Sequence, residues 1–178
     1  MPKDNPTPMD LRDELHINKP LEPGQEIMLA VLLTREYLAR LSDERLFKPA
    51  RITDQQFNVL RILKGGPADG YLIRELRRRM IYHSADVPRL VERMVLAGLV
   101  QRREDPSDRR GSLVKLTPAG EELEARLAPV HSDLCREVAA LMAGQDSLGL
   151  VALLSHLRDG ISAKLEPREK AARRKPGK

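Results

Sequence analysis

The chain has 178 residues, 41% of them hydrophobic and 3% aromatic, with a formal net charge of +5 and a single cysteine, Cys135. This length suits one domain, or one domain with an added oligomerisation layer, and the aliphatic composition favours helices packed on helices over a β-sandwich. Without an apolar run of transmembrane length, a secretory signal or a second cysteine for a disulfide, we expect a cytoplasmic protein.

The first elements are predicted to be an irregular arm and a long helix. Residues 1–24 hold several prolines and a closing Gly24, with room for a short helix around Met9–His16. From Gln25 to Leu46 apolar residues lie nearly all round the predicted helix, so we expect it to be buried on more than one side. The segment Lys48–Ala50, with its central proline, is predicted to end it.

Two shorter helices follow. Thr53 with Gln56 three residues later forms a capping-box pattern, which predicts a helix that Gly65, Gly66 and Pro67 then stop. Leu72–Met80 is predicted to be a short basic helix with three arginines in its last turn, where the helix dipole favours positive charge.

The next predicted helix is strongly amphipathic. Ser84 is its expected N-cap, and Gly98 supplies the left-handed position after its C-terminus. One face carries apolar residues at helical spacing, namely Val87, Leu90, Val91, Met94 and Val95. The opposite face carries Asp86, Pro88, Arg89, Glu92 and Arg93.

A β-hairpin is predicted directly after this helix. Its strands are Val100–Glu104 and Leu113–Thr117, and its loop is Asp105–Gly111. Thr117 should cap the following helix, with Pro118 at its first position. That helix and a final one over Asp146–Leu165 carry leucine stripes with little winged domain left to cover, so we expect a helical dimer interface.

Positive charge gathers in the middle of the chain. Between Leu72 and Leu116 there are eleven Lys and Arg against six Asp and Glu, a difference of +5 that equals the net charge of the whole chain. Such a concentration is typical of a surface that binds phosphates. A second basic cluster, Lys164–Lys178, has the composition of a disordered tail.

Three segments resemble the MarR family of bacterial transcriptional regulators: Thr53–Leu63 (TDQQFNVLRIL), Val87–Val100 (VPRLVERMVLAGLV) and Asp105–Gly120 (DPSDRRGSLVKLTPAG). The resemblance implies a mainly α fold with a small β-hairpin wing, a winged helix-turn-helix with N- and C-terminal dimerisation helices. It covers residues 25–165, with a DNA-binding lobe over 50–117 and dimerisation helices over 25–47 and 118–165. The irregular arm, 1–24, and the basic tail, 166–178, lie outside it.

The resemblance also implies a function: a homodimeric repressor that binds a pseudo-palindromic duplex operator. Arg89 and Arg93 match positions that face the major groove, and Arg110 matches an arginine of the wing tip that enters the minor groove, steadied by Asp108. Pro88 replaces a hydroxyl-bearing residue, and Asp86 would repel phosphate but could accept from a cytosine amino group. The predicted DNA-binding residues are Ser84, Asp86, Pro88, Arg89, Arg93, Asp108, Arg109 and Arg110.

Members of the family are usually released from DNA by a small aromatic or phenolic ligand bound between the dimerisation and winged regions. The candidate aromatic residues here are Tyr37, Phe57, Tyr71 and Tyr82, of which Phe57 also fits a place in the core. We predict no cofactor and no membrane partner.

Other functions fit the sequence less well. An enzyme is disfavoured because the chain has four histidines but no glycine-rich phosphate loop and no paired-histidine motif. His131 and Cys135 have a spacing that could begin a metal site, yet two ligands do not complete one. A winged-helix interaction module would not explain the clustered arginines, and a redox-responsive regulator using Cys135 would rest on one adjacent arginine.

Overall fold

The structure, a computed structural model, describes residues 10–82, 85–105 and 108–173, with side chains described except at 105, 108–110 and 166–173. It is mainly helical with one three-stranded antiparallel sheet, which confirms the predicted fold class. The elements in chain order are α1 (Leu11–Glu14), α2 (Pro23–Ser42), a π-helical turn η1 (Asp43–Phe47), α3 (Lys48–Ala50), α4 (Asp54–Lys64), β1 (Tyr71–Leu72), α5 (Ile73–Arg79), α6 (Val87–Leu96), β2 (Val100–Asp105), β3 (Asp108–Leu116), α7 (Pro118–Leu141) and α8 (Ser147–Arg173).

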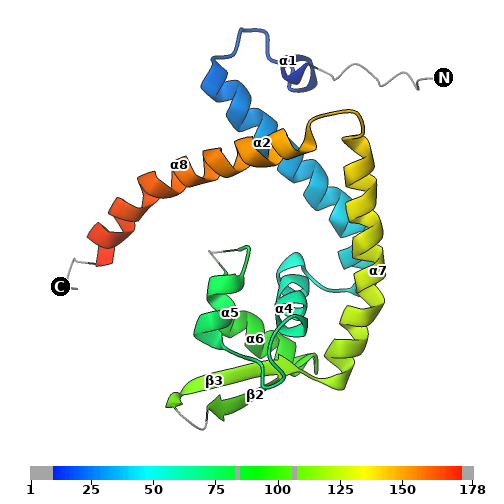
Figure 1. The fold of residues 1–178 in the computed structure, drawn as a ribbon, viewed down its shortest axis with the longest axis vertical. Coiled ribbons are helices and arrows are strands. Elements are labelled where there is room, and N and C mark those ends of the chain that lie inside the picture. The colour runs from blue at the N-terminus through cyan, green and yellow to red at the C-terminus, as the bar shows by residue number, and fades with distance from the viewer. Residues whose placement is uncertain (1–9, 83–84, 106–107, 174–178) are drawn as a thin grey trace. The chain divides into compact units, whose positions relative to one another are not determined.

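The chain forms two compact units, Met1–His131 and Ser132–Lys178, and the boundary falls within α7. In the first unit α4, α5 and α6 pack against one another and against the sheet (Figure 1). Their shared core is almost entirely aliphatic, as the composition predicted, and its most deeply buried side chains are Leu46, Val59, Leu60, Leu76, Val87, Leu90, Val91, Met94, Val100 and Val114.

The helix caps agree with the sequence at α4 and differ at α6. Thr53 and Gln56 form the predicted capping box, with the Thr53 amide donating to Gln56 Oε1 at 2.9 Å and the Gln56 amide donating to Thr53 Oγ1 at 3.2 Å. At α6 the N-cap is Asp86, whose Oδ1 accepts from the Arg89 amide at 3.3 Å. The prediction that Ser84 is the N-cap is therefore wrong, and Ser84 itself lies outside the described residues. Gly98, at φ +70°, has the predicted left-handed conformation.

The first long helix is longer and more exposed than predicted. The helical run begins at Pro23, passes through the wide turn η1 and continues to Ala50, where Arg51 ends it with a left-handed φ of 53°. None of the residues of α2 is buried, although Leu46 and Phe47 of η1 are. The expectation that this helix is buried on more than one side is therefore wrong within one chain, because the core of the first unit reaches only its C-terminal end.

The sheet contains a strand that the sequence pattern did not reveal. β1 pairs with β3 through Tyr71 opposite Val114 and Leu72 opposite Leu113, so β3 lies in the centre and β2 at an edge. The hairpin strands are also longer than predicted, and the register shifts near the tip: Glu104 faces Ser112, whereas the next residue, Asp105, faces Asp108.

A tight joint connects the hairpin to α7. Thr117 caps the helix as predicted, since its Oγ1 accepts from the Gly120 amide at 3.1 Å and its hydroxyl donates to the Gly98 carbonyl at 2.5 Å. A Cβ on Gly120 would stand 2.0 Å from the Leu99 carbonyl oxygen, so this position leaves no room for a side chain. The joint therefore fixes the first turn of α7 against the segment that follows α6.

The second unit holds the last part of α7 and α8. The final helix begins one residue after the predicted Asp146, whose side chain accepts from the Gly149 amide at 2.8 Å. The helical backbone continues to Arg173, so the predicted disordered tail over 166–178 is wrong for 166–173, while 174–178 lie outside the described residues. No helix among the described residues is long and apolar enough to cross a membrane.

Candidate nucleic-acid interface

The two faces of α6 have opposite environments. Val87, Leu90, Val91 and Met94 are at most 1% exposed, which anchors the helix in the core. Arg89, Glu92 and Arg93 are exposed on the other side. Because the buried face holds the helix axis in place, the two arginines are presented on a rigid element, as the amphipathic pattern predicted.

The N-terminus of α6 has a defined cap. Asp86 is exposed but its carboxylate accepts from the Arg89 amide, and Pro88 occupies the second helical position, where no backbone donor is needed. The Asp86 side chain thus has a structural task in addition to the base contact that the sequence suggested. Pro88 is exposed beside it.

The basic end of α5 carries three arginines, all exposed. Arg79 has partners within the chain: its guanidinium lies 4.1 Å from the centre of the Tyr71 ring, and Nη1 donates to the Glu75 carbonyl at 3.2 Å. Arg77 and Arg78 extend the positive surface beside α6 and were not among the predicted site residues. Their sequence signals were the run of arginines at a helix end and the excess of positive charge between Leu72 and Leu116.

The segment between α5 and α6 is tied to α4. The Ile81 amide donates to Asn58 Oδ1 at 3.0 Å, and Tyr82 bonds to Asp54 in the first turn of α4. Burial raises the pKa of Tyr82 to about 12, and the hydrogen bond to Asp54 adds to the effect. The tyrosine therefore stays protonated and can donate to the carboxylate. These contacts help to set where α6 begins.

The hairpin carries further exposed cations. Arg102 and Arg103 on the edge strand β2 are exposed, and neither was among the predicted site residues. The backbone of Asp108, Arg109 and Arg110 lies in β3 rather than in the predicted loop. Their side chains are outside the described residues, so their roles stay predictions.

The four candidate aromatic residues have separate surroundings. Tyr37 is exposed on α2 and its hydroxyl donates to Glu14. Phe57 is buried in the core, with its ring centre 5.8 Å from that of Phe47 and 5.3 Å from that of His131. Tyr71 lies under Arg79, and Tyr82 bonds to Asp54. The structure does not bring them together around one site.

The structure also describes the residues of the redox and metal-site alternatives. Cys135 is exposed and forms no disulfide. Within the described part of the chain, no three His, Cys, Asp or Glu side chains gather in a way that could hold a metal ion.

Comparisons with known proteins agree on one family. The model of the MarR family matches residues 52–111, which run from the start of α4 into the hairpin. The transcriptional regulator HosA of Escherichia coli O111:H- is 28% identical over 95 residues, which are 53% of this chain and 69% of that protein.

Solved structures extend the likeness to most of the chain. One is a cysteine-to-serine mutant of MarR from E. coli complexed with operator DNA, with 28% identity, a TM-score of 0.60 and coverage of 86% of this chain and 99% of that one. Another is BpsR of Bordetella bronchiseptica, whose DNA binding is regulated by 6-hydroxynicotinic acid; it has 21% identity, a TM-score of 0.63 and coverage of 79% and 96%.

Proposed function

This chain belongs to the MarR family of transcription regulators, and from that premise we propose that it binds duplex DNA sequence-specifically as a homodimeric repressor. The observation that carries the proposal is the division of α6 into a buried apolar face and an exposed face with Arg89 and Arg93. A helix of this kind fits the major groove of B-DNA, where arginine makes bidentate contacts to guanine.

Exposed cations around α6 support binding to the DNA backbone. Arg77 and Arg78 precede it in the chain, and Arg102 follows on β2. Lys and Arg at such positions neutralise phosphates and orient a protein on the duplex without reading sequence. At the hairpin tip we propose that Arg110 enters the minor groove, with Asp108 holding its guanidinium, because a narrow minor groove attracts arginine.

The exposed apolar residues of α2 support a dimer. Ile27, Met28 and Leu32 are 52%, 65% and 55% exposed, which is costly for a helix in water unless another surface covers them. A second copy supplies such a surface, and a two-fold dimer presents two equivalent α6 helices to successive major grooves. We propose this arrangement, with half-sites about 10 bp apart.

Release by a small molecule is the regulatory part of the proposal. It is supported by BpsR, whose DNA binding responds to 6-hydroxynicotinic acid, a protein that shares this fold. The proposal for this chain is that a small-molecule effector lowers its affinity for the operator.

The test begins with selection of bound duplexes from genomic DNA by the purified protein, followed by anisotropy titrations. Arg93→Ala should weaken operator binding by about 1–3 kcal/mol and relax the preference at one base pair. The logarithm of affinity should fall steeply with the logarithm of salt concentration. Lys164→Ala, at an exposed position on α8, is the matched control for the loss of one positive charge.

Two results would overturn the proposal. One is selection of no duplex sequence above background, and the other is an Arg93→Ala protein that binds the operator and its variants like the control. Wild-type protein that sediments as a monomer while it binds the operator tightly would overturn the dimer alone.

A further inference from the structure

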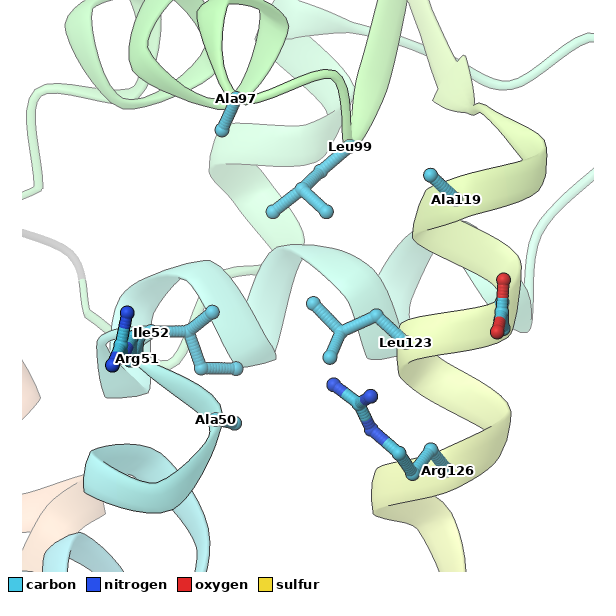
Figure 2. A pocket seen from close by; sticks show the side chains of 9 residues that line it. Ala50, Arg51, Ile52, Ala97, Leu99, Ala119, Leu123 and Arg126 are labelled. Carbon is cyan, nitrogen blue, oxygen red and sulfur yellow. The ribbon is translucent and has the colours of Figure 1, made fainter.

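An open pocket of about 360 Å³, five of whose nine lining residues are exposed, lies on the side of the first unit where the end of α3, the segment after α6 and the start of α7 meet. Figure 2 shows side chains from these segments surrounding a common space. None of the four aromatic residues discussed above contributes to its lining. The apolar part of the lining consists of Ala50, Ile52, Ala97, Leu99, Ala119 and Leu123.

Three charged residues complete the lining: Arg51, Arg126 and Glu122. Two cations and one carboxylate give the pocket a formal charge of +1. Within the described part of the chain neither arginine forms an ion pair or a side-chain hydrogen bond. Arg126 extends from α7 toward the space between Leu123 and Ala50 (Figure 2). An unpaired guanidinium beside apolar side chains is suited to a carboxylate, which it can bind through two parallel hydrogen bonds.

The rest of the lining restricts what else the ligand can carry. No hydroxyl, amide, imidazole or aromatic side chain is among the lining residues. Further polar groups on a ligand would find few side-chain partners there and would add little affinity. A hydrocarbon body, by contrast, gains from contact with leucine, isoleucine and alanine. The volume is in the range of small-molecule sites.

We infer that this pocket binds a small aliphatic carboxylate, with Arg126 holding the carboxylate and the alanine, leucine and isoleucine side chains contacting the chain of the ligand. The regulatory part of this inference rests on the proposed function. It follows from the place of the lining residues, since Ala97 and Leu99 lie in the segment between α6 and β2. Ala119 and Leu123 lie on α7, across the Thr117 joint. A bound ligand therefore contacts both sides of the joint that holds the end of α6, and it shifts DNA affinity through that joint.

The first experiment measures ligand binding to the full chain without DNA, by calorimetric titration. Octanoate is the probe, with octylammonium and 4-hydroxybenzoate as comparisons. We expect saturable octanoate binding at one site per chain. Octylammonium should bind at least about tenfold more weakly, because its charge opposes the arginines, and so should 4-hydroxybenzoate, because its hydroxyl is poorly matched.

Three variants locate the site. Arg126→Gln should weaken octanoate binding about tenfold or more, the loss expected for one charge-assisted pair. Glu122→Gln should strengthen binding by removing the repelling carboxylate, whereas Glu121→Gln, a neighbouring exposed position outside the lining, should leave it unchanged. Ala119→Met should weaken binding by occupying part of the pocket, with unchanged circular dichroism as the check on folding.

The second experiment adds octanoate to the protein bound to its selected DNA and should show a lowered DNA affinity in the wild type and a smaller response in Ala119→Met. The site is overturned if octanoate does not saturate, or if Arg126→Gln and Ala119→Met bind it like the wild type. The ligand class is overturned if octylammonium or 4-hydroxybenzoate binds as tightly as octanoate. Octanoate binding with unchanged DNA affinity overturns the regulatory role, and failure to bind any DNA overturns the proposed function while the titration still decides the site.

Discussion

Helices α6 and α2 are both rich in apolar residues but bury them to different degrees. Four of the five residues predicted for the apolar face of α6 are almost completely covered, with Leu90 at 1% exposure and Met94 at 0%, whereas the fifth, Val95, is 39% exposed. In α2 apolar side chains are open, with Leu32 at 55% and Met28 at 65%. Apolar residues in a predicted helix therefore do not by themselves say whether the same chain covers them. The fold buries α6 by itself and leaves the apolar side chains of α2 exposed within one chain, as the proposed dimer requires.

The largest expected effect comes from comparing a leucine-to-alanine substitution in α6 with one in α2. Leu90→Ala should lower the free energy of unfolding by about 2–5 kcal/mol, because it leaves a cavity in a closed core. Leu32→Ala should cost little in dilute protein, and its effect on the melting temperature should grow with protein concentration, as expected when folding and association are linked. Equal losses at all concentrations would mean that α2 is covered within its own chain.

The second prediction tests how tightly the first turn of α7 packs against the segment that follows α6. Gly120→Ala should destabilise the protein by about 1–3 kcal/mol, because the new methyl group would collide with the Leu99 carbonyl. Gly160→Ala in α8, where nothing lies within 4 Å of the added Cβ, should instead stabilise by about 0.5–1 kcal/mol. Denaturant titrations of both variants would measure these changes. If Gly120→Ala left the free energy of unfolding unchanged, the backbone at this joint could move apart without loss of stability.

The third prediction concerns how α6 is held at its start. Asp86→Ala should cost about 1 kcal/mol of stability through loss of the N-cap. Asp86→Asn keeps an acceptor oxygen and should preserve stability. If Asp86 also reads a cytosine amino group, the asparagine variant should change the preferred operator sequence without changing the unfolding midpoint. An Asp86→Ala protein as stable as the wild type would contradict a stabilising role for the Asp86 N-cap.

The smallest expected effect is a pH dependence of stability that arises from His131 on α7. Burial, and the positive charge of Arg61, lower the pKa of His131 below its usual 6.5. Arg61 also pairs with Glu124 at 3.4 Å, and Glu124 is itself 4% exposed. The folded state then binds fewer protons than the unfolded chain near pH 6. The resulting stability is present above about pH 6.5 and is lost as the pH falls through the folded pKa.

Denaturation midpoints between pH 5 and 7.5 measure this effect. The wild type should lose more stability on acidification than His131→Gln, while His156→Gln, at an exposed position on α8, should follow the wild type. Identical pH profiles for the wild type and His131→Gln would contradict the assignment.

The sequence predicted those features that depend on neighbouring residues. The Thr53 capping box, the buried face of α6, the left-handed Gly98 and the Thr117 cap all follow from residues within a few positions of one another. Such signals are local, and they were sufficient to locate the winged region and the arginine-bearing face of α6.

Features that depend on distant contacts were missed. β1 exists because Tyr71 and Leu72 pair with a strand more than forty residues later, and two residues carry no periodic signal. Ser84 and Asp86 are both good caps, and contacts from Asn58 and Asp54 on α4 help to hold the segment that ends at Asp86. The pocket draws alanines and leucines from three separate segments, none of which is unusual alone.

The π-helical turn η1 makes the junction between α2 and the core sensitive to chain length. A π turn accommodates one extra residue in a helix, and here it separates the exposed apolar residues of α2 from the buried Leu46 and Phe47. Deleting Asp43 would convert the turn to an ordinary α-helix and rotate everything before it by about 100° relative to the core. Among homologous sequences, an insertion or deletion at this point would then rotate the exposed apolar residues of α2 about the helix axis without changing any of those residues. If an Asp43 deletion variant associated with itself as tightly as the wild type, self-association would not depend on the rotation of α2 relative to the core.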